Sequence, residues 1–322
     1  MVRRVLFRRF SDLLRFDQQG LTCTYTVDRR WQHNWVLVNF LRTVRGLTAS
    51  NSGDLASPAH DHLWTRHLPP GHQKRGVPLS LLVTVQSCFY AIPEAAPTQL
   101  RLQPRLASWN AMDHPDQVRL RAALHDAGEL LKPALSEFDV PLAVRLDVGL
   151  PSTVRLLSEH DLDNYAFPLM FYLAKQTTRQ FVSVWCTKQR VDKSFVRVEP
   201  AVAMTGPVSS DYRVEVHTTA SGSTTTYKQQ IHDQLAGATE LAVGPVSLQI
   251  AFVVGPRRNW LNLWKPTIDA LDQILGQTRP DRLWHPRDGR IIELGLHRTT
   301  DDDLGNDVLM AITANSGRGG SK

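Results

Sequence analysis

Two aspartates one residue apart, Asp161 and Asp163, precede Asn164 where a predicted strand gives way to a predicted helix. At such a junction both carboxylates can face one point, and Asp192, on a later turn before a strand, can supply a third oxygen ligand. Three carboxylates offer the hard oxygen donors that Mg²⁺ prefers, with room left for waters and a phosphate. A cation held there polarises a phosphodiester and activates water for attack. Asp161, Asp163 and Asp192 are therefore candidate metal ligands, and if they form such a cluster at least one of them should have a raised pKa without the metal.

Helix capping is the competing explanation of the same residues. Asp163 or Asn164 can cap the helix that follows, since Asp and Asn are preferred at that position, and the helix dipole favours an acid there. From the four residues Asp-Leu-Asp-Asn alone, capping is the more frequent outcome. Both explanations stay open at this point.

Hydrophobic periodicity predicts the elements that must position these residues. Residues 81–85 are a predicted strand, residues 117–131 have the apolar spacing of a helix, and residues 142–148 alternate as a strand. A polar turn then leads to a short helix that starts near Asn164. The series ends at residues 187–200 as a turn that runs into a strand.

The same series recurs in the second half of the chain. It consists of a strand, a short helix, an alternating strand, a helix, a turn that runs into a strand, and a last strand, at residues 212–216, 227–235, 246–252, 258–275, 284–298 and 308–312. Three matches occur in the same order: Pro141 with Pro245, Asn164 and Pro168 with Asn262 and Pro266, and Asp192 with Asp288. We therefore expect residues 78–313 to be two diverged copies of one α/β unit. The alternative is two unrelated domains with a similar order of elements.

The order of strand, Asp-Leu-Asp-Asn, helix with a lysine and an Asp-Ala-Leu segment, and an Asp-containing turn before a strand resembles the RusA family of Holliday junction resolvases. Members of that family are small Mg²⁺-dependent endonucleases that act as dimers on four-way DNA junctions in recombination and repair. The resemblance covers each repeat. It implies an α+β architecture in which two RusA-like lobes, residues 78–205 and 206–314, form a pseudo-dimer. An irregular basic extension at 1–77 precedes the lobes, and a flexible tail at 315–322 follows them.

Each lobe keeps a different part of the family's motif. In the first lobe the matching positions are Asp161, Asp163, Asn164 and Asp192, whereas Phe167 stands in place of the family's helix lysine. In the second lobe the matching positions are Asn262, Lys265 and Asp288, whereas Asn259 and Leu261 replace the acid pair. The resemblance thus implies one surviving site, with Asp161, Asp163 and Asp192 as its catalytic metal ligands. Lys265 contributes only if the lobes bring it close, and the expected cofactor-binding positions are Asn164, Asn262 and Asp288.

Two functions follow from this pattern. The first is Mg²⁺-dependent DNA binding or cleavage of branched DNA through the single site in the first lobe. The second is a catalytically inactive RusA-like scaffold that binds DNA or a protein partner. The intact Asp-Leu-Asp-Asn favours the first, and the division of the motif between the lobes favours the second.

The positive charge of the chain lies at its N-terminal end. Residues 1–76 carry 12 Lys and Arg against 5 Asp and Glu, whereas the remaining residues carry 25 against 26. The predicted lobes are therefore nearly neutral, which weakens an argument for phosphate binding from the net charge of +6. The basic segment either contacts DNA or is a solvated leader.

The remaining features indicate an ordinary globular protein. The longest apolar runs, 35–41 and 248–254, are far shorter than a membrane crossing requires, and no membrane partner is expected. Three widely spaced cysteines form no metal-binding pattern and fit a reducing compartment, so the expected location is the cytoplasm. Trp260 and Trp264, four residues apart, are expected to pack in the core or between the lobes rather than to stack on bases.

Overall fold

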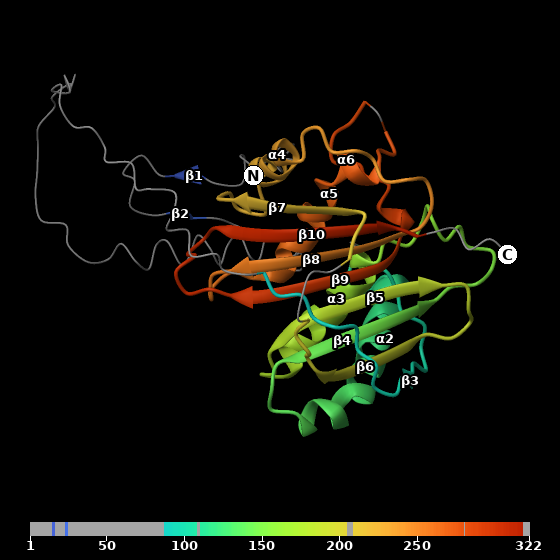
Figure 1. Cartoon of the computed structure of the whole chain (residues 1–322). Coiled ribbons are helices and arrows are strands. Elements are labelled where there is room, and N and C mark those ends of the chain that lie inside the picture. The colour runs from blue at the N-terminus through green and yellow to red at the C-terminus, as the bar shows by residue number, and fades with distance from the viewer. Residues whose placement is uncertain are drawn as a thin grey trace, which may run out of the picture. The chain divides into compact units, whose positions relative to one another are not determined.

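The structure is a computed structural model (Figure 1) that describes residues 15–16, 23–24, 87–107, 110–204, 209–279 and 281–317. Segments Ser80–Ser108 and Pro115–Lys322 form one compact unit, which contains every element below except the short pair β1 (Arg15–Phe16) and β2 (Cys23–Thr24). The predicted strand at 81–85, nearly all of the predicted extension at 1–77 and the end of the predicted tail lie outside the described residues.

One eight-stranded mixed sheet runs through the unit in the order β3-β6-β4-β5-β9-β8-β10-β7. In chain order the strands are β3 (Thr98–Gln99), β4 (Leu142–Gly149), β5 (Phe181–Gln189), β6 (Phe195–Pro200), β7 (Tyr212–Thr218), β8 (Val246–Val254), β9 (Ile291–Thr300) and β10 (Val308–Ser316). The pairs β4–β5 and β8–β9 are parallel, and the other neighbours are antiparallel. Both predicted lobes contribute strands to this sheet, and the predicted α+β class is confirmed.

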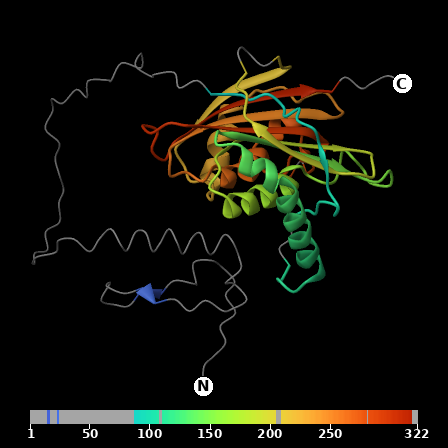
Figure 2. The same ribbon diagram turned by 90° about the horizontal axis from the view of Figure 1, so that it is seen from below.

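The helices lie on one face of this sheet (Figure 2). α2 (Pro115–Glu137) packs against β6 and against α3 (Asp163–Gln176), which in turn packs against β5. The helical segments of the second half are α4 (Thr225–Gln234), η4 (Trp260–Leu263), α5 (Trp264–Asp269) and α6 (Asp272–Leu275). Because α3 contacts η4, the helical layer is continuous across the two halves of the sheet. The main apolar core lies between this layer and the sheet.

The pairing pattern is the same on both sides of the central β5–β9 pair, in which Trp185 lies opposite Gly295. In β4–β5 and in β8–β9 alike, the register shifts after the first residue pair. β5 therefore corresponds to β9, and β6 corresponds to β10. Asp192 follows β5 whereas Asp288 precedes β9, so the predicted match between these two aspartates is wrong.

The error has a physical cause in β5, a strand that the sequence pattern did not indicate. Residues 181–186 are buried on both faces of the sheet, so the strand lacks the alternation by which a half-exposed strand is recognised. Without β5, the strand at the end of the first series, β6, takes the place of the strand that corresponds to β9. The other predicted strands and helices of the described residues are present, although α2 continues to Glu137, six residues beyond its expected end, and one predicted helix is interrupted.

The predicted helix at 258–275 is broken into η4, α5 and α6. Trp260 and Trp264 are buried, and their ring centroids lie 4.9 Å apart in an edge-to-face arrangement. Trp264 also meets Phe167 of α3 edge-on at 6.5 Å, so this pair packs where the two halves meet, as predicted. Over the ranges that the structure describes, no helix combines the length and the apolar composition that a membrane crossing needs.

Candidate metal centre

The ends of neighbouring strands bring the acidic residues together. Asp161 lies in the connection that follows β4, and Asp163 is the first residue of α3. Asp288 starts the short helix η5 (Asp288–Arg290), which leads directly into β9. Because β9 runs antiparallel to β5, and β5 parallel to β4, the start of β9 lies at the same end of the sheet as the ends of β4 and β5. The fold therefore places an acid of the second half beside the acid pair of the first.

Asp161, Asp163 and Asp288 form one acidic group, in which one carboxylate oxygen of each residue lies within 4.8 Å of those of the other two. Asp163 is only 3% exposed. Lys265 of α5 reaches the group from the second half, with its Nζ 3.0 Å from Asp288 Oδ2 and 2.9 Å from Asp269 Oδ1. The group thus combines side chains that the sequence assigns to different lobes.

Asp192, the predicted third ligand, is not part of this group. It is exposed in the turn between β5 and β6, where its backbone carbonyl accepts a hydrogen bond from the side chain of Gln103. The third carboxylate comes from Asp288, which the sequence motif assigned to the cofactor-binding positions of the second lobe. Lys265 is expected to contribute only if the two lobes bring it close to the acids, and the fold does bring it to the acidic group.

The capping explanation of Asp163 and Asn164 is wrong. The N-cap of α3 is Leu162, whose side chain makes no capping hydrogen bond, and Asp163 already lies within the first turn. Asn164 contacts Asp161 instead, and its Nδ2 donates to Asp161 Oδ2 at 3.3 Å. No hydrogen-bond donor among the described residues contacts the carboxylate of Asp163. The acid pair is therefore free of the helix N–H groups that a cap would engage.

Burial and mutual repulsion raise the pKa of both members of the acid pair. Burial raises the pKa of Asp163 to about 7, opposed by Lys265 and assisted by Asp288 and Asp161. Burial also raises the pKa of Asp161, and the charge of Asp288 is the next cause. Burial lowers the pKa of Lys265, but the carboxylates of Asp163, Asp288 and Asp269 together outweigh it and raise that pKa. The predicted raised carboxylate pKa is confirmed, with burial as the largest cause.

A second lysine, Lys188, lies near the end of β5 and is 3% exposed. Its Nζ donates to the backbone oxygens of Glu159 at 2.8 Å, His160 at 3.0 Å and Gly289 at 2.6 Å. Burial lowers the pKa of Lys188 to about 8, although Asp161 and Asp288 act in the opposite direction. This lysine therefore contacts the chain directly beside two of the three acids.

Sequence reasoning missed the roles of Lys188 and Asp269. Asp269 had an available signal, because it follows Lys265 by four residues, the spacing at which helix side chains meet. No sequence signal marked Lys188, since it lies on the strand that was not predicted. Its partners Glu159 and Gly289 are 29 and 101 residues away in the chain.

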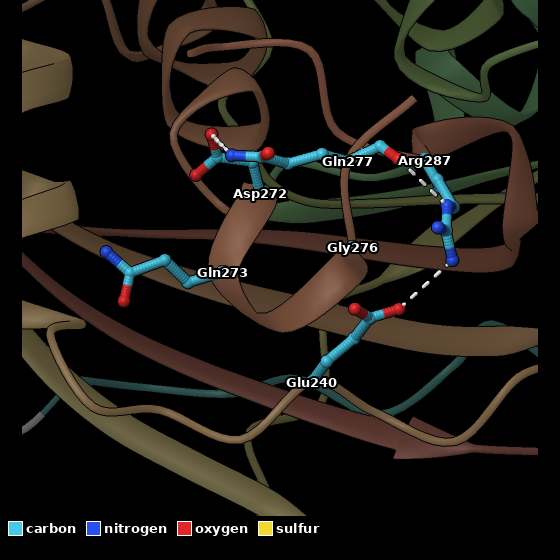
Figure 3. Close-up of a pocket in the computed structure, with 6 residues that line it drawn as sticks. All are labelled: Glu240, Asp272, Gln273, Gly276, Gln277 and Arg287. Carbon is cyan, nitrogen blue, oxygen red and sulfur yellow. Dashed lines mark hydrogen bonds and ion pairs between the residues drawn. The ribbon is translucent and has the colours of Figure 1, made fainter. Parts of the chain in front are cut away.

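The connection between α6 and η5 carries Asp288, and Figure 3 shows how its base is held. Arg287 donates from Nε to the backbone oxygen of Gln277 at 3.0 Å and from a terminal nitrogen to Glu240 at 3.1 Å. Gln277 in turn donates to the buried carboxylate of Asp272 at 3.0 Å. These residues line a polar hollow of about 310 Å³. The hydrogen bonds of Arg287 and Gln277 in this hollow hold the connection in place just before Asp288.

The corresponding positions of the other half carry no acid pair. Asn259 caps η4 by accepting a hydrogen bond from the Leu261 N–H at 3.1 Å, and Leu261 is buried in the apolar core. Phe167, which corresponds to Lys265, packs against Trp264. Asn262, a predicted cofactor-binding position, has a side-chain oxygen that is buried without a hydrogen-bond partner in the described residues. Within the described ranges, the acidic group is thus the only one of its kind.

The acidic group has the chemistry and the spacing to hold a metal ion. Two oxygens bound to one Mg²⁺ at 2.0–2.1 Å lie at most about 4.2 Å apart. Neighbouring ligands of an octahedral Mg²⁺ lie only about 2.9 Å apart. The three carboxylate oxygens, within 4.8 Å of one another, would therefore have to approach by up to about 2 Å, a change within reach of side-chain rotation. A cation would also offset the cost of burying the negative charge of Asp163, whose carboxylate accepts no hydrogen bond from the described residues. The residues present fit a hard divalent cation.

No protein-family model and no curated protein matches this chain.

Proposed function

We propose that the protein is a Mg²⁺-dependent DNA-binding protein or endonuclease that acts on branched DNA through one composite site. The observation that carries the proposal is the meeting of Asp161 and Asp163 with Asp288 and Lys265. The sequence resemblance assigns the first two to one copy of the RusA motif and the last two to the other. The fold thus brings the motif residues of both copies to one place, where together they could bind a metal ion and a phosphate.

We also infer that the unit is a fused pseudo-dimer of two RusA-like lobes. The matching strand pairings on either side of β5–β9 support this, as does the shared register shift in β4–β5 and β8–β9. The losses in the two lobes are complementary. The first lobe has Phe167 where the second has Lys265, and the second has Asn259 and Leu261 where the first has its acid pair.

The side chains have separate tasks in this proposal. Asp161, Asp163 and Asp288 hold the cation, and Asn164 orients Asp161 through its hydrogen bond. Mg²⁺ bound there would polarise a phosphodiester and generate a nucleophilic hydroxide from water. Lys265, with 46% of its side chain exposed, can turn from Asp288 to a phosphate oxygen. One such site cuts one strand at a time, so the expected product is a nick rather than a symmetric resolution of a junction.

The test is cleavage of four-way, flap and linear DNA with Mg²⁺ or Mn²⁺. Wild type is compared with the Asp161→Asn/Asp163→Asn double variant, and Asp192→Asn serves as the matched control because Asp192 is an exposed acid outside the group. We expect wild type and the control to cut branched DNA and the double variant to be inactive. Metal-dependent cleavage that persists in the double variant would refute the assignment.

A second function, an inactive scaffold that binds DNA or a protein, is favoured by one observation. Lys265 already pairs with Asp288 and Asp269, so part of the acidic charge is compensated without a metal. On this alternative no cleavage occurs with either metal, and binding of DNA or of a protein partner is unaffected by chelation. Metal-stimulated cleavage by wild type excludes it.

A further inference from the structure

The two turns that carry the acids meet backbone to backbone. A Cβ placed on Gly289 would lie 2.7 Å from the carbonyl carbon of Ser158 and 3.0 Å from the nitrogen of Glu159. Only glycine fits at this approach without displacing the neighbouring chain. His160, at the end of the same turn, has a φ of 63°, a left-handed conformation that is uncommon for a residue other than glycine. The contact therefore depends on close packing and on a conformation that needs support.

Lys188 supplies bonds to both turns at once. Glu159 and His160, two of its three acceptors, directly precede Asp161, whereas Gly289, the third, directly follows Asp288. An ammonium group has three donors, and all three are used on backbone oxygens. Because the first turn belongs to one half of the sheet and the second turn to the other, Lys188 connects the two halves at the acidic group.

We propose that Lys188 is a positioning residue for cation binding, which holds Asp161 and Asp288 at the separation that a shared metal ion requires. This inference rests on the proposed function, because it assigns a role within that site. Lys188 acts through the backbone and not through the carboxylates, and it is not a catalytic residue. Without it, the 158–160 turn and the 288–290 turn lose the bonds that join them, and the acids they carry lose their fixed spacing.

Replacing residues that orient metal ligands commonly lowers metal affinity about 10- to 100-fold. The test is Lys188→Met, which keeps a long apolar stem and removes the three donors, with Mn²⁺ affinity measured by isothermal titration calorimetry on the folded full-length chain. The matched control is Leu131→Ala, a buried apolar residue of α2 outside the acidic group, whose loss destabilises the fold without touching either turn.

We expect Lys188→Met to bind Mn²⁺ about 10- to 100-fold more weakly than wild type, and Leu131→Ala to bind it unchanged. Equal affinity in Lys188→Met and wild type would overturn the inference. So would an equal loss in both variants, because general destabilisation would then explain it. Wild type that binds no Mn²⁺ contradicts the proposed function itself and is thus distinguished from a failure of Lys188 alone.

Gly289→Ala is a second, independent variant that keeps Lys188 and every charge. Its added Cβ must push the two turns apart. We expect the same direction of change in Mn²⁺ affinity, and this variant decides the matter if Lys188→Met does not fold. Unchanged affinity in Gly289→Ala would contradict the dependence on the spacing of the two turns.

Discussion

Lys265 Nζ lies 3.0 Å from Asp288 Oδ2, next to the point where a metal ion would bind. The lysine also contacts Asp269, one turn along the same helix, so its position is set by two carboxylates. In the metal-free protein it is therefore the local counter-charge of the acidic group. From the same position, Lys265 could contact a phosphate oxygen once a cation is bound by the acids.

Lys265→Met should separate metal binding from DNA cleavage. Removing the lysine takes a competing positive charge away from the acids, so Mn²⁺ should bind at least as tightly as in wild type. Cleavage should fall about 100-fold, the usual cost of losing one group that stabilises the transition state. Calorimetry and a nicking assay on the same preparation test this, and a parallel loss of affinity and cleavage would contradict the assigned role.

The stability of the metal-free protein should decrease with pH through the titration of Asp163. Burial raises the folded-state pKa of this carboxyl to about 7, from its usual value of 3.8. Between these pH values the folded state holds a proton that the unfolded state has released, so the free energy of unfolding falls as pH rises. Urea unfolding in EDTA at pH 5 and pH 8 measures this, with Asp163→Asn as the control that removes the contribution. An equal pH dependence in wild type and the variant would exclude Asp163 as its source.

Asp163→Asn should stabilise the metal-free protein at pH 8 and abolish stabilisation by Mg²⁺. A pKa raised from 3.8 to about 7 corresponds to about 4 kcal/mol. This is an upper limit for the gain, since an uncharged amide still needs hydrogen bonds at a buried position. Wild type should gain thermal stability on addition of Mg²⁺, because a ligand that binds only the folded state stabilises it. Thermal unfolding with and without Mg²⁺ checks both effects, and a variant that still responds to Mg²⁺ would refute Asp163 as a ligand.

The acid pair and most of the described elements could be predicted from sequence because their signals are local. Asp161 and Asp163 are separated by a single residue in the chain. β4 and β8 each begin directly after a proline, at positions that the repeat identified. The strand β5 has no local signal, since it is buried on both faces. Because β5 was not predicted, Asp192 was wrongly matched with Asp288 and expected to be the third ligand.

The third acid and both lysines depend on tertiary structure. Asp288 and Lys265 join the acid pair only because β9 runs antiparallel to β5 across the middle of the sheet. Sequence marked both residues as motif positions, but it gave no means to decide which acid pair they would serve. Lys188 contacts only backbone oxygens, which carry no residue-specific pattern.

The central claim is that the two halves of the chain share one metal site, and paired aspartate variants test it most directly. Asp288→Asn removes the ligand from the second half, and Asp192→Asn removes the exposed acid of the first half that lies outside the group. Mn²⁺ stoichiometry and affinity are measured for both by calorimetry beside wild type. We predict one Mn²⁺ per chain in wild type and in Asp192→Asn, and a loss of binding in Asp288→Asn. Binding that survives in Asp288→Asn and is lost in Asp192→Asn would contradict the composite site.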